Sequence, residues 1–170
     1  MERTPAPVVD GWFTDMGAEG GFRLLGTRCS ACTAVFFPRE DAYCRNPRCP
    51  GDGALDEVPL SPRGRVWSYT DGRYRPPEPY VSDPDAPWEP YTLVAVELEA
   101  EGMVVLGQAA PGVTVADLAV GMEVEVVGGV LEGDGEDDGQ GPYTTWRFRP
   151  VAGSGTGAGT GTGSRAGGAS

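Results

Sequence analysis

Four cysteines near the start of the chain have the types and spacing of a metal site. Cys29, Cys32, Cys44 and Cys49 are the only cysteines in the 170 residues, and they fall within one 21-residue window. Their spacing, C-x2-C-x11-C-x4-C, gives two close pairs that an intervening loop can bring together around one tetrahedral ion. We therefore predict a structural zinc ribbon in which all four thiolates bind Zn²⁺.

Other uses of these cysteines are less favoured. Two disulfides would require an oxidising compartment, and residues 1–9 contain no apolar run of the length that a signal peptide needs. Iron remains an alternative to zinc, since rubredoxin-type sites use the same four thiolates. A redox role for Cys29 and Cys32 alone is disfavoured because a second pair lies so close in the sequence.

The composition removes most of the usual catalytic groups. The chain has no histidine and no lysine, because all thirteen basic residues are arginine. No Ser-His or Cys-His couple and no lysine Schiff base can therefore form. With the cysteines assigned to metal, we predict no catalytic residue in this chain, although Tyr, Asp and Glu leave open a stand-alone enzyme using acid–base chemistry.

Charge and hydropathy limit the possible partners. The formal net charge is -12, and residues 76–150 hold two arginines against fifteen acidic residues. Nucleic-acid binding is the commonest use of zinc ribbons and small β-barrels, and it is our alternative function. The anionic surface opposes it, because binding to nucleic acid depends on neutralising phosphates. No apolar stretch approaches the ~20 residues of a membrane span. We expect a cytoplasmic protein that contacts neither nucleic acid nor membrane.

Residue patterns predict a mainly β protein made of four segments. These are an N-terminal helical segment (1–21), a rubredoxin-like zinc ribbon (22–60), a five-stranded OB-fold barrel (61–151) and a disordered Gly/Ser/Thr tail (152–170). An open sandwich is the competing architecture. Helical spacing of apolar residues predicts a short helix over 8–16. The expected ribbon strands are 22–27, 35–38 and 54–60, and the expected barrel strands are 64–70, 91–99, 103–109, 123–130 and 143–148, with one helical turn at 115–118.

Two large aromatic residues, Trp12 and Phe13, lie on the apolar face of the predicted helix. Packing against the body of the domain is the favoured role for them. Docking on a partner protein is the alternative, because both side chains are large for so short a helix. A proline-rich loop over 76–90 and an acidic, glycine-rich loop over 132–141 complete the outline.

The chain also resembles a known family, once called domain of unknown function 35 (DUF35). The resemblance covers about residues 8–151 and departs from the family in the longer second cysteine loop and the proline-rich segment. It is carried by the segments 22–25, 29–32, 37–39, 64–70, 90–98, 102–108, 121–126 and 146–150.

This resemblance implies a function. Members of the family typically act as small subunits beside thiolase-like enzymes that make or break carbon–carbon bonds on acyl-CoA thioesters. The segment 102–108 is most similar to subunits paired with lipid-transfer-protein-type aldolases and thiolases, including those that cleave steroid side chains by a retro-aldol reaction. In this interpretation the chain binds a CoA thioester and the partner holds the catalytic residues. Candidate contacts to the CoA phosphates are Arg63, Arg65, Arg73 and Arg75, whose alternative role is pairing with local acids.

Overall fold

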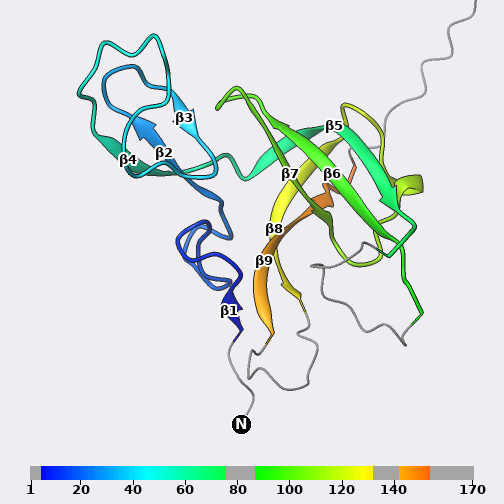
Figure 1. Cartoon of the computed structure of the whole chain (residues 1–170). Helices are drawn as coiled ribbons and strands as arrows, with labels where there is room; N and C mark the ends of the chain where they lie inside the picture. Colours follow the sequence, from blue (N-terminus) through cyan, green and yellow to red (C-terminus); the bar gives the residue numbers. More distant parts are fainter. Residues whose placement is uncertain (1–4, 76–86, 132–141, 154–170) are drawn as a thin grey trace, which may run out of the picture.

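The computed structural model describes residues 5–75, 87–131 and 142–153 as a chain of β-strands with one short 3₁₀ helix (Figure 1). The first strands are β1 (Ala6–Pro7), β2 (Leu25–Cys29), β3 (Val35–Phe36) and β4 (Leu55–Pro59). They are followed by β5 (Arg63–Gly72), β6 (Tyr91–Leu98), β7 (Met103–Ala109), the 3₁₀ helix η1 (Val115–Asp117), β8 (Glu123–Leu131) and β9 (Tyr143–Pro150). The mainly β fold class is confirmed.

The ribbon is a three-stranded antiparallel sheet in the order β3-β2-β4. Strand β2 pairs with β4 from Leu25 opposite Pro59 to Cys29 opposite Leu55, and with β3 at Thr27 and Arg28. Figure 1 shows this sheet standing apart from the larger barrel and joined to it by the short link between β4 and β5. The sheet is small, so little apolar side chain can be buried within it.

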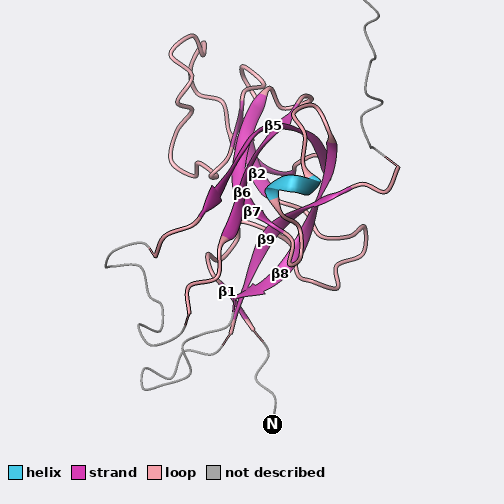
Figure 2. Ribbon diagram, turned by 90° about the vertical axis from the view of Figure 1, so that its right-hand side faces the viewer, coloured by secondary structure: helices cyan, strands magenta, loops and turns pink. Residues whose placement is uncertain are grey.

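The barrel closes through a ring of five strands. Strands β5, β6 and β7 form an antiparallel meander, β7 pairs in parallel with β9, and β9 and β5 both pair with β8. The helix η1 lies between β7 and β8, and Figure 2 shows it at one end of the barrel. This ring confirms the predicted OB-like barrel, with the predicted helical turn between its third and fourth strands.

Alternation along the strands builds the core. In β6, Thr92, Val94, Val96 and Leu98 are buried, while the residues between them are more exposed. Their inward side chains pack with Val66, Val105, Val124, Val126 and Phe148 from the other four strands. Period-two alternation is what a strand with one buried face requires, which is why the sequence predicted these strands.

The prediction of an N-terminal helix over residues 8–16 is wrong. Residues 8–16 contain turns and no helix, and the chain enters them from β1, which adds in parallel to β9 at Tyr143 and Thr144. Gly11 has φ 73°, a value outside the right-handed helical region. Phe13 then forms an antiparallel bridge with Leu24, and the Thr14 N–H donates to the Arg23 carbonyl. Pairing with distant strands therefore replaces the local helical hydrogen bonds that the apolar spacing indicated.

Five aromatic rings, which we call the aromatic joint, connect the N-terminal segment, the ribbon and the barrel. Trp146 of β9 lies with its ring centroid 6.0 Å from Trp12, 6.2 Å from Phe13 and 5.9 Å from Phe37. Trp12 also meets Phe37 edge-on at 5.5 Å, and Phe13 meets Phe22 at 5.4 Å. The joint therefore fixes the ribbon and the N-terminal segment against one end of the barrel.

Three sequence predictions fall wholly or largely outside the described residues. They are the proline-rich loop (76–90, of which 87–90 are described), the acidic loop (132–141) and the tail (152–170, of which 152 and 153 are described). The described part of the chain contains no helix long and apolar enough to cross a membrane.

Candidate metal centre and ligand-binding residues

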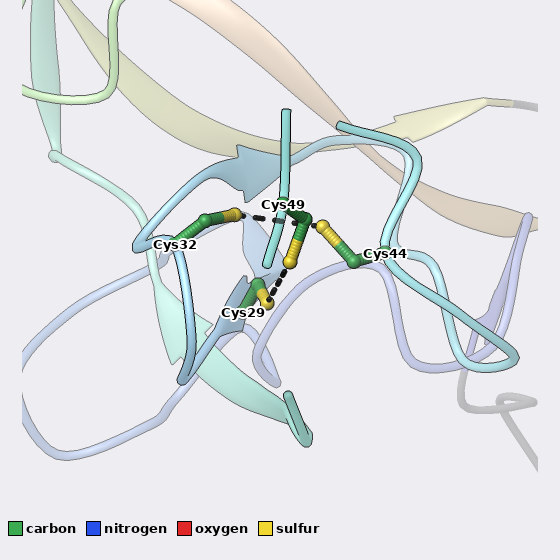
Figure 3. Close-up of side chains that lie close together, drawn as sticks. All are labelled: Cys29, Cys32, Cys44 and Cys49. Atoms are coloured by element: carbon green, nitrogen blue, oxygen red, sulfur yellow. Dashed lines mark hydrogen bonds between the residues drawn. The ribbon is translucent and has the colours of Figure 1, made fainter. Parts of the chain in front are cut away.

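The four cysteines converge from two loops of the ribbon. Cys29 ends β2 and Cys32 lies in the turn that follows, while Cys44 and Cys49 lie between β3 and β4. Figure 3 shows the four side chains pointing toward one another. All four Sγ atoms lie within 4.8 Å of one another, so the fold brings together every cysteine that the spacing assigned to the metal site.

The sulfur separations fit a tetrahedral ion. Cys29 Sγ is 3.7 Å from Cys49 Sγ, and Cys32 Sγ is 3.6 Å from Cys44 Sγ. Four zinc–sulfur bonds of about 2.3 Å at tetrahedral angles place the sulfurs about 3.8 Å apart, close to these values. A disulfide would bring two sulfurs to about 2.05 Å, and the cysteines are free. The residues therefore fit a zinc ion held by four thiolates and not a pair of disulfides.

Backbone amides surround the cluster and favour its negative charge. Cys32, Cys44 and Cys49 each receive a backbone hydrogen bond from the residue two positions further on, namely Ala34, Asn46 and Gly51. Hydrogen bonds to a thiolate stabilise its charged form. The local chain therefore presents donors where a metal-bound thiolate carries its charge.

These amides act together with burial on the thiol pKa values. The Ala34 backbone bond, helped by the Asn46 side chain, lowers the pKa of Cys32 to about 6. For Cys44 the Asn46 backbone bond also lowers the pKa, but desolvation and the neighbouring thiols outweigh it and raise the pKa to about 12. Without an ion, the crowded sulfurs thus favour deprotonation of one cysteine over its neighbours. A bound dication would stabilise all four thiolates, so that the four cysteines could be deprotonated together.

Gly53 is a residue of this site that the sequence analysis missed. A Cβ atom at this position would lie 2.6 Å from Cys29 Sγ and 2.7 Å from both the N and Cβ atoms of Ala31. No side chain therefore fits here without moving the first cysteine loop. A glycine four residues after the last cysteine is an ordinary loop residue in the sequence, so only the folded geometry identifies it.

The structure divides the four candidate CoA-binding arginines into two groups. Arg63 and Arg65 lie at the start of β5, whereas Arg73 and Arg75 follow its last residue. A ten-residue strand rises about 33 Å, so the two groups cannot hold one phosphate together. Each arginine also has a partner within the chain.

The partners of these arginines differ in kind. Arg63 Nη1 lies 3.4 Å from Glu123 Oε1, and Arg65 Nη1 donates to the Gly121 carbonyl at 3.1 Å. Both line an open hollow of about 540 Å³ that also contains Glu97, Glu99 and Glu123. At the other end of β5, Arg73 pairs with Asp71 at 2.6 Å, and Arg75 lies 5.7 Å over the Trp88 ring. CoA binding by these residues stays a prediction.

The two candidate partner-binding residues both contribute to the aromatic joint. Phe13 is buried in the core, and Trp12 is half-buried against Phe37 and Trp146. These contacts provide the packing role that the sequence analysis favoured. Docking of Trp12 or Phe13 on another protein stays a prediction.

Comparisons with known proteins give a consistent result. Residues 22–56 match the family described as ChsH2, rubredoxin-like zinc ribbon domain. The chain is 33% identical over 128 residues to a DUF35 domain-containing scaffold protein of Methanocaldococcus jannaschii, covering 75% of this chain and 82% of that one. A protein with the same description from Methanothermobacter thermautotrophicus is 32% identical over 119 residues, or 68% of this chain and 79% of that one.

A solved structure is also similar. It is described as Ltp2-ChsH2(DUF35) aldolase, and the match has a TM-score of 0.51 with 28% sequence identity. The match covers 75% of this chain and 84% of that chain, so it extends well beyond the ribbon.

Proposed function

Because this chain is a member of the DUF35 family, we propose that it is a non-catalytic accessory subunit of a thiolase-fold acyl-CoA aldolase or thiolase. One observation carries the proposal: the similar solved structure is described as an aldolase made of Ltp2 and a ChsH2 DUF35 chain. In the assembly that we propose, the larger subunit performs the chemistry. The curated relatives, described as scaffold proteins, support the same kind of role.

The side chains of this protein agree with such a division of labour. Its sequence has no histidine and no lysine, and its four cysteines converge in one cluster. Histidine bases and imine-forming lysines are thus absent, and the cysteine nucleophiles would be held by the metal. A subunit that stabilises a partner and completes its binding site needs none of them.

Zinc would have a structural role in this assembly. Cys29, Cys32, Cys44 and Cys49 would hold the ion, which cross-links the two ribbon loops. A sheet as small as β3-β2-β4 gains most of its stability from such a cross-link, because metal binding free energy contributes directly to folding. With the ribbon fixed, the aromatic joint can set its position on the barrel.

The proposed ligand of the assembly is an acyl-CoA thioester. Arg63 and Arg65 at one end of β5, or Arg73 and Arg75 at the other, would contact its phosphates from the side of the accessory subunit. The acyl group that we propose is a steroid side chain cleaved by a retro-aldol reaction. Each arginine has a local partner in the isolated chain, so phosphate binding would require that these contacts exchange on assembly.

Reconstitution of activity tests the proposal. A thiolase-fold aldolase subunit from the same organism would be assayed with a β-hydroxyacyl-CoA thioester, alone and with the full-length chain. We expect retro-aldol cleavage only in the mixture, and no turnover by the accessory chain alone. Turnover by the purified chain, or full partner activity without it, would contradict the proposal. Retention of the chain on duplex DNA at physiological salt would favour the nucleic-acid alternative.

A further inference from the structure

The outer face of the barrel carries an apolar surface across strands β5, β6 and β7. Trp67 and Leu106 are 60% and 58% exposed, and it is a contiguous patch of such side chains, rather than single ones, that marks an interaction site. The register places Leu106 opposite Ala95, and Ala95 opposite Ser68, the residue next to Trp67 at an irregularity in β5. We call Trp67, Ala95 and Leu106, together with their neighbours Leu93 and Gln108, the outer apolar surface.

A small recess adjoins the outer apolar surface on one side. It has a volume of about 220 Å³ and lies over β6, β7, β8 and β9. Its walls include Leu93, Leu106 and Gln108 from the outer apolar surface, joined by Leu131 and Thr145. The surface is therefore not flat, and it offers a recess in which a side chain from another molecule can be buried.

Arg147 binds the side chain of Gln108, which lines the recess, and no carboxylate among the described residues pairs with Arg147. Its guanidinium donates to Gln108 Oε1 at 2.6 Å and to the carbonyl oxygens of Ala109 and Val130 at 3.4 Å each. Its Nε atom is buried and has no acceptor within the described ranges. These acceptors are all neutral, and burial lowers the pKa of Arg147. Among the residues that the structure describes, the charge of this half-buried cation is thus only partly compensated.

Further along β9, by contrast, the arginine on the outside of the barrel has a carboxylate partner. Arg149 lies two residues along the same strand and binds Glu125 Oε1 at 2.7 Å, while Arg63 lies 3.4 Å from Glu123. Both ion pairs are solvent-exposed, and in each pair the arginine and the glutamate neutralise each other's charge. Of the two β9 arginines, Arg147 alone, on the side that adjoins the outer apolar surface, has a buried guanidinium nitrogen with no acceptor in the described part of the chain.

From these contacts we infer that the outer apolar surface, with Arg147 at its edge, is the surface on which the accessory chain docks its thiolase-fold partner. The inference rests on the proposed function and adds the location of the contact. The segment of the partner that it fits is apolar and carries a carboxylate that binds Arg147, with one apolar side chain in the recess. Exposed aromatic and aliphatic groups around a partly desolvated arginine form the usual centre of a protein interface.

Charge complementarity selects this occupant over a basic or neutral one. The guanidinium uses its Nη atoms on an amide and two carbonyls, so a carboxylate is the group that would supply its missing counter-charge. Arg65 and Glu97, which lie opposite each other on β5 and β6, border the surface and provide a more polar rim. Across the sheet, from β5 to β9, the contact spans three strand spacings, or about 14 Å.

Two substitutions with matched controls test the inference in the full-length chain. Leu106→Asp places a charge at the centre of the surface, and Val120→Asp places the same charge at a 67% exposed residue outside it. Arg147→Gln removes the partly compensated cation, and Arg149→Gln removes an exposed, paired one on the same strand. Binding to the reconstituted partner subunit would be measured by biolayer interferometry, with thermal melting to confirm that each variant is folded.

We expect Leu106→Asp and Arg147→Gln each to weaken binding at least tenfold, mainly through faster dissociation, because both act on desolvated contacts. The two controls should stay within about twofold of the parent protein, as rim positions do. If the parent binds the partner and both test variants bind equally well, this inference is overturned while the proposed function stands. If the parent binds no thiolase-fold subunit, both proposals fail.

Discussion

Trp146 gives the most exacting test of how the ribbon is fixed to the barrel. Its ring contacts Trp12, Phe13 and Phe37, and its Nε1 donates to the Leu106 carbonyl at 3.1 Å. Replacing it by alanine removes the barrel's contribution to the aromatic joint while leaving the β9 backbone in place. The substitution should therefore loosen the ribbon and the N-terminal segment together.

The expected cost follows from these contacts. Three aromatic pairs at about 0.5–1.5 kcal/mol each give roughly 1.5–4.5 kcal/mol beyond area burial. Large aromatic truncations in a core cost about 3–5 kcal/mol, and because this ring is only partly buried we expect Trp146→Ala to lie at the low end, lowering the free energy of unfolding by about 3 kcal/mol. For a domain whose total stability is about 5–15 kcal/mol, that is a large fraction.

Urea unfolding of the zinc-loaded protein, followed by far-UV circular dichroism, would measure this cost. Trp67→Ala is the matched control, since Trp67 is 60% exposed and its loss should cost about 0.5 kcal/mol or less. A double-mutant cycle between Trp12 and Trp146 should show a coupling energy of about 1 kcal/mol. Equal costs for Trp146→Ala and Trp67→Ala, or no coupling to Trp12, would refute the role that we assign to the joint.

Two further predictions concern single positions. Gly53→Ala should force the first cysteine loop aside and weaken zinc affinity about 10- to 100-fold in a competitive chelator titration. Gly17→Ala is the control, because a Cβ there meets nothing within 4 Å and zinc affinity should not change. Equal zinc affinities for the two variants would contradict the packing argument. Backbone and side-chain hydrogen bonds from Thr114 lower the pKa of Asp117 below 3.8, so its stabilising contribution is present above that pH and is lost as the pH falls through the lowered value. Asp117→Asn should therefore be less stable than the parent near pH 7 in urea unfolding, and the difference should shrink as the pH falls below 3.8. A difference that does not shrink on acidification would count against the capping role.

The ribbon and the barrel could be predicted from sequence because their signals are local. Alternation of buried residues, as in Val94, Val96 and Leu98, indicates a strand whatever its partner is. The cysteine spacing predicted the ligand set because each close pair must lie on one loop. The structure places all four sulfurs together, and the strand order closes the barrel that was expected.

The errors and omissions arise where distant contacts decide. Residues 8–16 have helical apolar spacing, but β1 pairs with β9 and Phe13 bridges to Leu24, so non-local pairing overrides the local preference. Gly53 matters only because its backbone passes close to Cys29, which no sequence pattern records. Arg147 was likewise not selected, because its incomplete charge compensation depends on which acids lie near β9 in the folded barrel.

Native mass spectrometry of the full-length chain co-expressed with the thiolase-fold subunit of the reconstitution assay tests the central claim most directly, since one spectrum reports both metal and assembly. Our account predicts a hetero-oligomer in which every copy of this chain carries the added mass of one zinc ion. A metal-free chain that still folds, or two proteins that never appear in one complex, would contradict it.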